Sequence, residues 1–434
     1  MSEILYSKQL EVRKSVDVFI AGGGPAGCAA AIAAARHGCS VFLAESQSSL
    51  GGMGTVGMIP AYMQFGDGDN FLAAGIGREI LERLWKYGGE EYEKSKTYSI
   101  KAEALKRVYD DMLTEAGVEF VFQTSMIDVN AADGKVNYCV LSSKSGVYAV
   151  KAKIYIDGTG DADLCAWAGA PYEKGDENGN MMAATLCSLW ANIDWKNVKG
   201  WDGRELEKAI DDGVFFQPDR HLPGMWKISN TVGGGNIGHT YGVDGTDEAT
   251  ITKAMVLGRK LVSPYEKYYK EYLTGYENME LTATGSLLGI RESRRVVCDY
   301  NLVLDDFFAQ ANFDDEIGRY CYPVDIHASD NSKESHAKFS HEHSNFRYKK
   351  GESYGVPYRI LLPQGLDNVF VTGRCVGTDR PMQSSIRVMP GCYITGQGAG
   401  VAAAICVKDG VDIRGVDVVK LQGMLRDMGM YMRD

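Results

Sequence analysis

Residues 16–45 read VDVFIAGGGPAGCAAAIAAARHGCSVFLAE and combine four features in one short stretch. An apolar run, Val16 to Ala21, is typical of a buried strand and leads directly into a glycine-rich turn. An alanine-rich segment, Cys28 to Arg36, predicts a helix, and Ser40 to Ala44 predicts a second short strand that ends at Glu45. A G-x-G-x-x-G turn between a strand and a helix, with an acid after the next strand, indicates a dinucleotide-binding unit.

The three glycines of this turn have distinct physical roles. Gly22 permits the tight turn, Gly24 lets a pyrophosphate approach the backbone, and Gly27 lets the helix pack closely on the strand. The free N–H groups at the start of the helix favour the charge of the phosphates. Glu45 is placed to accept hydrogen bonds from the hydroxyls of the adenosine ribose. We therefore predict dinucleotide contacts at Gly22, Gly24, Pro25, Ala26, Gly27 and Glu45.

The overall composition excludes several classes of function. The chain has 434 residues and a net charge of −11 with acids and bases mixed throughout, so we expect no nucleic-acid partner. Residues 1–14 are unlike a signal peptide and the alanine-rich runs are too short to span a bilayer, so we expect a cytoplasmic protein without a membrane partner. The ten cysteines contain no C-x-x-C pair and no ferredoxin-type spacing, and we predict no metal site. Formation of a homo-oligomer stays open.

Two further glycine–aspartate segments directly follow predicted strands. Residues 153–156 form an apolar run that ends in Asp157-Gly158-Thr159-Gly160-Asp161, and residues 368–372 form another that precedes Gly373 to Asp379. In an open α/β sheet, ligands bind at the carboxyl ends of the strands, so both segments belong with the first turn. A helix rich in small residues follows over 391–408. The nucleotide-binding domain is therefore predicted to be discontinuous, formed by residues 1–170 and 356–434.

The fold class that follows is α/β: a Rossmann-like domain that carries a small antiparallel meander and an inserted α+β substrate domain. The predicted strands of the meander are residues 125–129, 135–142 and 147–151. Residues 171–355, whose patterning is irregular, form the predicted insertion. Within it we predict a long helix over 246–272, a flexible turn at 233–236 and a polar loop over 329–353.

Several motifs along the chain match one family of flavoproteins. The matching segments are Gly22 to Gly27 with Glu45, Ile156 to Asp161, Gly289 to Arg295, Tyr322 to His327, Gly373-Arg374, and Arg387 to Gly400. With them the chain resembles the FAD-dependent oxidoreductases of the glutathione-reductase structural class. It is most similar to a bacterial group related to the flavin subunit of heterodisulfide reductase. The resemblance spans residues 16–405 and implies that the dinucleotide is FAD.

The resemblance also implies which residues contact FAD. The loop after Glu45 would lie along the pyrophosphate and the flavin edge, and the second glycine–aspartate segment would lie beneath the adenosine half. Asp379 would contact the ribitol or the pyrophosphate. The helix that begins at Gly391 would direct its N-terminus at the pyrimidine edge of the flavin, where negative charge grows on reduction. The implied set is Gly51, Gly52, Met53, Thr55, Gly160, Asp161, Gly373, Arg374, Asp379, Gly391 and Thr395.

Departures from the family pattern restrict these expectations. Relatives with covalently attached flavin use a histidine early in the chain, and residues 51–62 contain none, so we expect non-covalent FAD. The sequence shows no second strand–G-x-G-x-x-G–helix unit, so we predict no domain for NADH or NADPH. The glycines of Gly396 to Gly400 fall inside a predicted helix and are explained by close packing.

Two histidines are candidate catalytic groups, because a flavin performs the redox chemistry and the protein supplies an acid or base. For His327 and His239, contact with substrate and a structural hydrogen bond are both open. The histidines of the polar loop, His336, His341 and His343, are expected to be solvated, and the alternative is that this loop is a lid over the active site.

Arginines supply the candidate substrate-binding groups. Arg291 has the planar guanidinium that binds carboxylates in a bidentate manner, but it and its neighbours Arg294 and Arg295 can equally pair with nearby acids. Arg387 directly precedes the last long helix and is the best arginine candidate for contact with substrate or flavin.

We therefore predict an enzyme, an FAD-dependent oxidoreductase that transfers a hydride between the flavin and a small polar substrate with a carboxylate or hydroxyl group. The direction of transfer stays open. Two alternatives are an electron-transfer subunit that works with a separate redox protein, and a protein that uses FAD structurally. The missing cluster cysteines count against the first, and the histidines and arginines of the insertion count against the second.

Overall fold

The computed structural model describes residues 4–5, 7–87, 97–200, 203–221 and 223–433. Its central sheet contains parallel strands in the order β5-β2-β1-β8-β19. These strands are β1 (Val12–Ala21), β2 (Val41–Ala44), β5 (Glu119–Val121), β8 (Gly146–Asp157) and β19 (Val369–Val371). Phe19 and Ile20 of β1 are fully buried, which is typical of a parallel strand covered on both faces. The predicted α/β, Rossmann-like fold class is confirmed.

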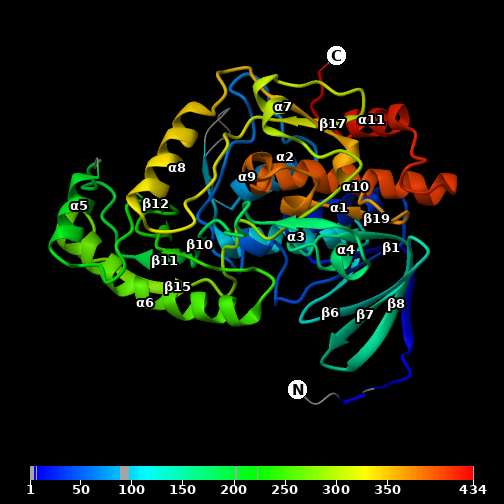
Figure 1. The fold of residues 1–434 in the computed structure, drawn as a ribbon, viewed down its shortest axis with the longest axis horizontal. Coiled ribbons are helices and arrows are strands. Elements are labelled where there is room, and N and C mark those ends of the chain that lie inside the picture. The colour runs from blue at the N-terminus through cyan, green and yellow to red at the C-terminus, as the bar shows by residue number, and fades with distance from the viewer. Residues whose placement is uncertain (1–3, 6, 88–96, 201–202, 222, 434) are drawn as a thin grey trace.

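The predicted meander is present beside the parallel strands. β6 (Ser125–Ala132) pairs antiparallel with β7 (Lys135–Ser143), which pairs antiparallel with the first half of β8. Figure 1 shows this hairpin extending away from the rest of the sheet. The two strands predicted at 147–151 and 153–156 are one continuous strand, because β8 stays paired with β1 through Lys151, Ala152 and Ile154. In the sequence, the charged residues Lys151 and Lys153 look like the end of one apolar strand and the start of another.

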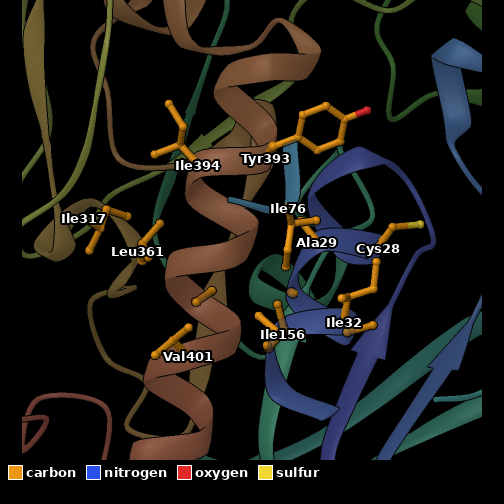
Figure 2. Packing of buried hydrophobic residues seen from close by; sticks show 14 of the residues in the cluster. Cys28, Ala29, Ile32, Ile76, Ile156, Ile317, Leu361, Tyr393, Ile394 and Val401 are labelled. Carbon is orange, nitrogen blue, oxygen red and sulfur yellow. The ribbon is translucent and has the colours of Figure 1, made fainter. Parts of the chain in front are cut away.

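Two glycine- and alanine-rich helices cross in the core. α1 (Pro25–Arg36) packs against α10 (Met389–Asp409), and a Cβ atom on Gly400 would lie 2.3 Å from the carbonyl oxygen of Ala30. Figure 2 shows α10 between the side chains of α1 on one side and Ile317 and Leu361 on the other. The prediction that the glycines inside α10 serve close packing is confirmed.

A second, smaller sheet lies at the far end of the molecule from the meander (Figure 1). Its order is β12-β13-β11-β15. The strands are β11 (Ser188–Ala191), β12 (Gly224–Lys227), β13 (Gly233–Asn236) and β15 (Glu280–Thr284), and the neighbouring helices are α5 (Arg204–Asp211) and α6 (Glu248–Tyr272). The long helix predicted over 246–272 is thus confirmed as α6, and Asp247 caps it by accepting a hydrogen bond from the N–H of Ala249. Trp190, Tyr265 and Tyr269 belong to the hydrophobic core between this second sheet and its helices.

The flexible turn predicted at 233–236 is wrong, because these residues are strand β13. Its glycines are required by packing. A Cβ atom on Gly233 would lie 2.5 Å from Ile193 Cδ1, and one on Gly234 would lie 2.4 Å from Pro60 Cβ. A run of glycines looks like a turn in sequence, although here it lets other side chains approach the strand closely.

The polar loop predicted over 329–353 is also wrong in part, because residues Lys333–Asn345 form helix α8. The carboxylate of Asp330 accepts hydrogen bonds from the N–H of Ser332, just before the helix, and from Ser335 Oγ in its first turn. His336 is buried, whereas His341 is exposed, and the side chain of His343 lies outside the described part of the chain. Because α8 buries only a narrow face, its sequence has no apolar periodicity that would predict a helix.

The predicted insertion does not pack as one unit. Residues Ile317 and Tyr320 of β17 (Glu316–Tyr320) and Tyr354 of β18 (Tyr354–Pro357) belong to the same core as α1 and α10. The boundaries at 171 and 355 stay predictions, and the packing favours a smaller insertion. The remaining elements are β3 (Ala61–Tyr62), α2 (Ile76–Trp85), β4 (Tyr98–Ser99), α3 (Ala102–Glu115), α4 (Asp163–Trp167), β9 (Tyr172–Lys174), β10 (Ala184–Thr185), β14 (His239–Thr240), β16 (Arg294–Val296), α7 (Leu304–Phe308), α9 (Arg380–Ile386) and α11 (Val418–Asp427). Among the described residues, no helix has the length and apolar character needed to cross a membrane.

Candidate functional site

A cavity of about 440 Å³ lies at the carboxyl ends of the parallel strands. It is lined by residues that follow β1, β2, β8 and β19, among them Gly22, Glu45 and Gly373. Leu287 and Ile290 of the predicted insertion also line it. The position agrees with the rule that open α/β sheets bind ligands at this edge.

The glycine-rich turn has the geometry that a bound pyrophosphate needs. Gly22 has a φ of +96° and a Cβ atom there would lie 2.5 Å from the carbonyl oxygen of Gly158. A Cβ atom on Gly27 would lie 2.0 Å from the carbonyl oxygen of Gly22. At Gly24 the nearest atom, the Gly158 oxygen, is 3.9 Å away, so a side chain there would fill the cavity instead of meeting protein. These positions support the three roles predicted from the sequence.

The N-terminus of α1 is open toward a ligand. Gly24 is its N-cap and makes no side-chain capping bond, and Pro25 follows as the first helical residue. Gly24, Pro25 and Ala26 all line the cavity. Because the first N–H groups of a helix lack partners within the helix, this end can bind phosphate oxygens.

Glu45 is buried and lines the same cavity. Its carboxylate accepts hydrogen bonds from the N–H of Gly23 at 2.6 Å and the N–H of Gln47 at 2.7 Å. Burial raises the pKa of Glu45 above its ordinary value, although these two bonds act in the opposite direction. The residue therefore ties the turn after β1 to the end of β2 and also presents a carboxylate to the cavity.

The loop after Glu45 divides into residues that face the cavity and residues that support it. Gly52 and Met53 line the cavity. Gly51, which the resemblance placed along the cofactor, instead donates its N–H to the Gly23 carbonyl oxygen at 2.8 Å. Thr55 is fully buried, and its hydroxyl donates to the carbonyl oxygen of Leu50. The structure thus gives Gly51 and Thr55 a supporting position behind the loop.

The second glycine–aspartate segment faces the cavity and is tied to the third. Gly160, Asp161, Gly373 and Arg374 all line the cavity. Arg374 Nη2 forms an ion pair with Asp161 Oδ1 at 2.7 Å. A Cβ atom on Gly160, where φ is +85°, would lie 2.6 Å from Arg374 Nη1, so the glycine is required for this pairing.

Three residues predicted to contact FAD lie elsewhere. The carboxylate of Asp379 caps α9 by accepting from the N–H of Met382, and it also accepts from the N–H of Leu304. Thr395 is buried inside α10, and its hydroxyl accepts the N–H of Gly373 from behind. Gly391 is covered by Ile386, whose carbonyl oxygen lies 2.3 Å from the position of a Cβ atom. None of the three lines the cavity, so each supports the wall from behind and its contact with FAD stays a prediction.

The start of α10 lies two residues earlier than predicted. The helix begins at Met389 rather than Gly391, with Pro390 in its first turn. Arg387, Met389 and Cys392 are the residues of this segment that line the cavity. The N-terminus of α10 therefore still borders the cavity as predicted, but the residues that line it are not the predicted Gly391 and Thr395.

A second cavity of about 370 Å³ adjoins the first. The residues that line both cavities are Met53, Ile290, Arg374, Arg387 and Met389. Arg291, His221 and His327 line only the second cavity. The candidate catalytic groups therefore lie beside the dinucleotide cavity, on the side formed by the predicted insertion.

Arg291 is the arginine of its cluster that reaches the second cavity. It is buried, and its guanidinium donates to the carbonyl oxygen of Ala183, to Thr185 Oγ1 and to Asn236 Oδ1. Within the described chain, no ion pair is formed by Arg291. Burial, together with the charge of Arg387, lowers the pKa of Arg291 to about 10.

The neighbouring arginines have structural partners. Arg294 pairs with Asp163 at 2.7 Å, and Arg295 pairs with Glu292 at 2.7 Å. The alternative of pairing with nearby acids thus holds for these two and not for Arg291. Arg387 Nη2 donates to the backbone oxygen and the carboxylate of Asp325, both at 3.1 Å.

Three histidines meet at the wall of the second cavity. His327 Nδ1 lies 3.2 Å from His239 Nε2. The centroid of the His221 ring lies 4.8 Å from the centroid of the His239 ring and 5.2 Å from that of the His327 ring. His239 and His327 are buried. Burial lowers the pKa of His221 to about 3 and lowers the pKa of His327 well below its ordinary value, so both rings are neutral at neutral pH.

His239 and His327 were predicted from the sequence as candidate catalytic groups, whereas His221 was not. Spacing gave no signal, because the three residues come from segments that meet only in the folded chain. His336 is a further difference: it is buried, and its Nε2 lies 3.7 Å from Asp219 Oδ1, so the expectation that it is solvated is wrong.

The Rossmann-like sheet and the glycine-lined cavity at its carboxyl edge define a dinucleotide-binding protein. The model of the family described as FAD dependent oxidoreductase matches residues 17–425, and the chain belongs to this family. It is an enzyme, and its cofactor is FAD. The open N-terminus of α1, the clear space at Gly24 and the carboxylate of Glu45 fit that cofactor.

Several solved structures are similar over most of the chain at low identity. A geranylgeranyl bacteriochlorophyll reductase-like protein from Thermoplasma acidophilum is 12% identical, with a TM-score of 0.47 and coverage of 96% of this chain and 82% of that one. The flavin-dependent brominase Bmp2 is 14% identical, with a TM-score of 0.48 and coverage of 95% and 83%. The p-nitrophenol 4-monooxygenase PnpA from Pseudomonas putida DLL-E4 is 12% identical, with a TM-score of 0.48 and coverage of 97% and 90%. No curated protein matches the chain.

Proposed function

We propose that this FAD-dependent oxidoreductase transfers a hydride between the flavin and a small polar substrate that carries a carboxylate and binds in the second cavity. The observation that carries the proposal is the position of Arg291. Its buried guanidinium lines that cavity and has neutral partners, and in the described chain it forms no ion pair.

The carboxylate of Asp325 acts on Arg291 only from beyond ion-pair distance, so in the described chain the buried guanidinium has no direct anionic partner, and a carboxylate ligand would supply one. Thr185 and Asn236 hold the guanidinium in place, so a planar bidentate contact needs little reorganisation. Arg387 lines the same cavity but is held by Asp325, so it adds positive potential while Arg291 supplies the specific contact.

Bound FAD would donate or accept the hydride. The chain's own residues would position the substrate, exclude water and move a proton. Ile290 and Leu287 of the predicted insertion close the first cavity, and His327 is the buried imidazole that lines the second. A neutral imidazole in this position can accept the proton that a hydroxyl or amine substrate loses as its hydride leaves.

We also propose a kinship with the flavin subunit of heterodisulfide reductase, on the motifs Gly289 to Arg295 and Arg387 to Gly400. It would favour the alternative in which a separate redox protein exchanges electrons with FAD. The two hypotheses predict different results. If the substrate is a small molecule, the flavin changes redox state only when that molecule binds in the second cavity. If a redox protein is the partner, the flavin exchanges electrons without a small molecule there.

The test is anaerobic mixing of the purified holoenzyme with a panel of small hydroxy- and amino-carboxylates while the flavin absorbance is followed. Each acid is paired with its methyl ester or amide, which lacks the charge. We expect bleaching by one acid and weak or no bleaching by its neutral pair. Arg291→Lys should raise the substrate concentration for half-maximal bleaching, and Arg359→Lys, which alters a partly exposed pair with Asp315, should leave it unchanged. Equal bleaching by acid and ester, or none by any acid in either redox direction, would overturn the proposal.

A further inference from the structure

Three imidazoles from separate segments converge on one point. His221 lies before β12, His239 begins β14, and His327 precedes α8. One ring nitrogen from each lies within 4.8 Å of the others. His221 and His327 also line the second cavity, so the point of convergence is at the cavity wall.

The spacing of two of these nitrogens suits a shared metal ion. His327 Nδ1 and His239 Nε2 are 3.2 Å apart. Two nitrogens bound to one tetrahedral zinc ion, each at about 2.0–2.1 Å, stand roughly 3.3 Å apart. A hydrogen bond has a similar length, so the distance alone does not decide between a shared proton and a shared ion.

The second ring nitrogen of His239 and that of His327 favour a shared metal ion over a shared proton. His239 Nδ1 lies 3.0 Å from Asp219 Oδ2, and His327 Nε2 lies 3.3 Å from Asp325 Oδ2. Both rings thus turn one nitrogen toward the cluster and the other toward a carboxylate. This arrangement orients histidine ligands in metal sites and raises their basicity.

Asp219 is held firmly in that supporting position. It is buried, and its carboxylate accepts hydrogen bonds from the N–H of His221 at 2.9 Å and the N–H of His239 at 3.1 Å. The backbone at both His221 and His239 is therefore tied to the carboxylate that supports the cluster.

We propose that His221, His239 and His327 bind a divalent transition-metal ion, Zn²⁺ in first place, with an open coordination position toward the second cavity. Imidazole nitrogens prefer such ions over Mg²⁺ or Ca²⁺. Three protein ligands with a free position are the pattern of catalytic zinc sites. The assignment replaces the expectation from the sequence that the chain holds no metal.

The charges around the site both oppose and favour a dication. Arg291 and Arg387 line the same cavity and oppose it, whereas Asp219 and Asp325 offset that repulsion. If the proposed function holds, the ion would take over the role given there to His327, because it would polarise a hydroxyl or carbonyl oxygen of the substrate whose carboxylate contacts Arg291. Metal binding itself does not depend on that function.

The direct test uses FAD-loaded protein without a polyhistidine tag. The protein is dialysed against a chelator, and the metal content is measured by mass spectrometry before dialysis and after titration with Zn²⁺. Co²⁺ is titrated in parallel, because a tetrahedral Co²⁺ site absorbs at longer wavelength than the flavin. We expect one ion per chain for both metals, with unchanged FAD content.

Variants assign the ion to the cluster. His239→Ala and His327→Ala should abolish stoichiometric binding, and Asp219→Asn should weaken it by about 10–100-fold. His336→Ala removes a buried histidine beside Asp219 and is the matched control, which should bind normally. If an alanine variant loses FAD through misfolding, the wild-type titration and Asp219→Asn decide.

Wild-type protein that binds neither Zn²⁺ nor Co²⁺ would overturn the proposal, as would full binding in both alanine variants. Because no substrate is present in these measurements, their outcome is separate from the test of the carboxylate substrate.

Discussion

Gly396 of α10 lies directly against the backbone of Ala26 in α1. A Cβ atom at Gly396 would stand 2.2 Å from the carbonyl oxygen of Ala26, far inside van der Waals contact. Ala26 also lines the dinucleotide cavity, one residue after Pro25 at the start of α1. The crossing of the two helices therefore sets the position of the N–H groups that we expect to bind the pyrophosphate.

Gly396→Ala should destabilise the protein and weaken its retention of FAD. The added methyl group forces α1 and α10 apart, and overpacking of this kind costs about 1–3 kcal/mol. Thermal unfolding followed by flavin fluorescence measures both effects. Gly423→Ala in α11 is the matched control, since its methyl group meets no atom within 4 Å and should stabilise the chain slightly. Equal effects from the two substitutions would contradict this account.

Glu45 should be needed for FAD affinity. Glu45→Ala removes the acceptor of the Gly23 and Gln47 N–H groups as well as the expected ribose contact. The loss of hydrogen bonds to a charged group is worth about 1.5–3 kcal/mol, or roughly 10–100-fold in affinity. Glu45→Gln keeps one acceptor oxygen and should fall between wild type and Glu45→Ala in a titration of apoprotein with FAD. An exposed substitution, Glu103→Ala, should bind FAD normally.

Much of the cofactor cavity could be predicted because neighbouring atoms leave no room for a side chain at several of its glycines. Gly22, Gly27 and Gly160 each face an atom that excludes a side chain, and such constraints leave a fixed spacing in the sequence. Asp379 followed the same pattern of glycine and acid but caps α9, because a short polar side chain serves a helix N-terminus as well as a ligand.

The second cavity was less predictable because tertiary packing assembles it. His221 has no motif, and only the fold brings it to His239 and His327. The glycines of β13 look like a turn until their neighbours, such as Pro60, are known. Arg291 and Arg295 are four residues apart in one motif, yet the first lines the cavity and the second pairs with Glu292.

Reduced nicotinamides should be poor reductants of this enzyme. The sequence shows a single G-x-G-x-x-G unit of the strand–turn–helix type, at Gly22 to Gly27, and FAD is its expected occupant. In anaerobic single-turnover mixing, NADH and NADPH should reduce the flavin slowly and without saturation. A chemical reductant such as dithionite, added to the same sample, verifies that the flavin can be reduced. Fast, saturable reduction by either nicotinamide would mean that a second nucleotide site exists.

The last prediction concerns an ion-pair network that joins α1, α2 and α3. Glu79 of α2 accepts hydrogen bonds from Arg36 of α1 at 2.6 Å and from Arg83 at 2.8 Å, and Arg83 also pairs with Glu115 of α3. Burial alone would raise the pKa of Glu79, but the bonds from Arg36 and Arg83 outweigh it and lower the pKa below its ordinary value. A carboxyl group whose pKa is lower in the folded state stabilises the fold above its unfolded pKa, and this stabilisation is lost as the pH falls through the folded pKa.

Glu79→Gln should therefore lower the melting temperature at pH 7 and have progressively less effect below about pH 4, where wild-type Glu79 also becomes neutral. The side chain is 29% exposed, so water screens the network and the expected loss at pH 7 is about 1 kcal/mol. Glu82→Gln on the same helix is the control, because its single pair with Arg78 is exposed and should contribute little at any pH. Melting curves of the three proteins from pH 3 to pH 8 make the comparison. A Glu79→Gln deficit that is the same at pH 3 and pH 7 would show that the side chain acts through packing, since protonation would then change nothing.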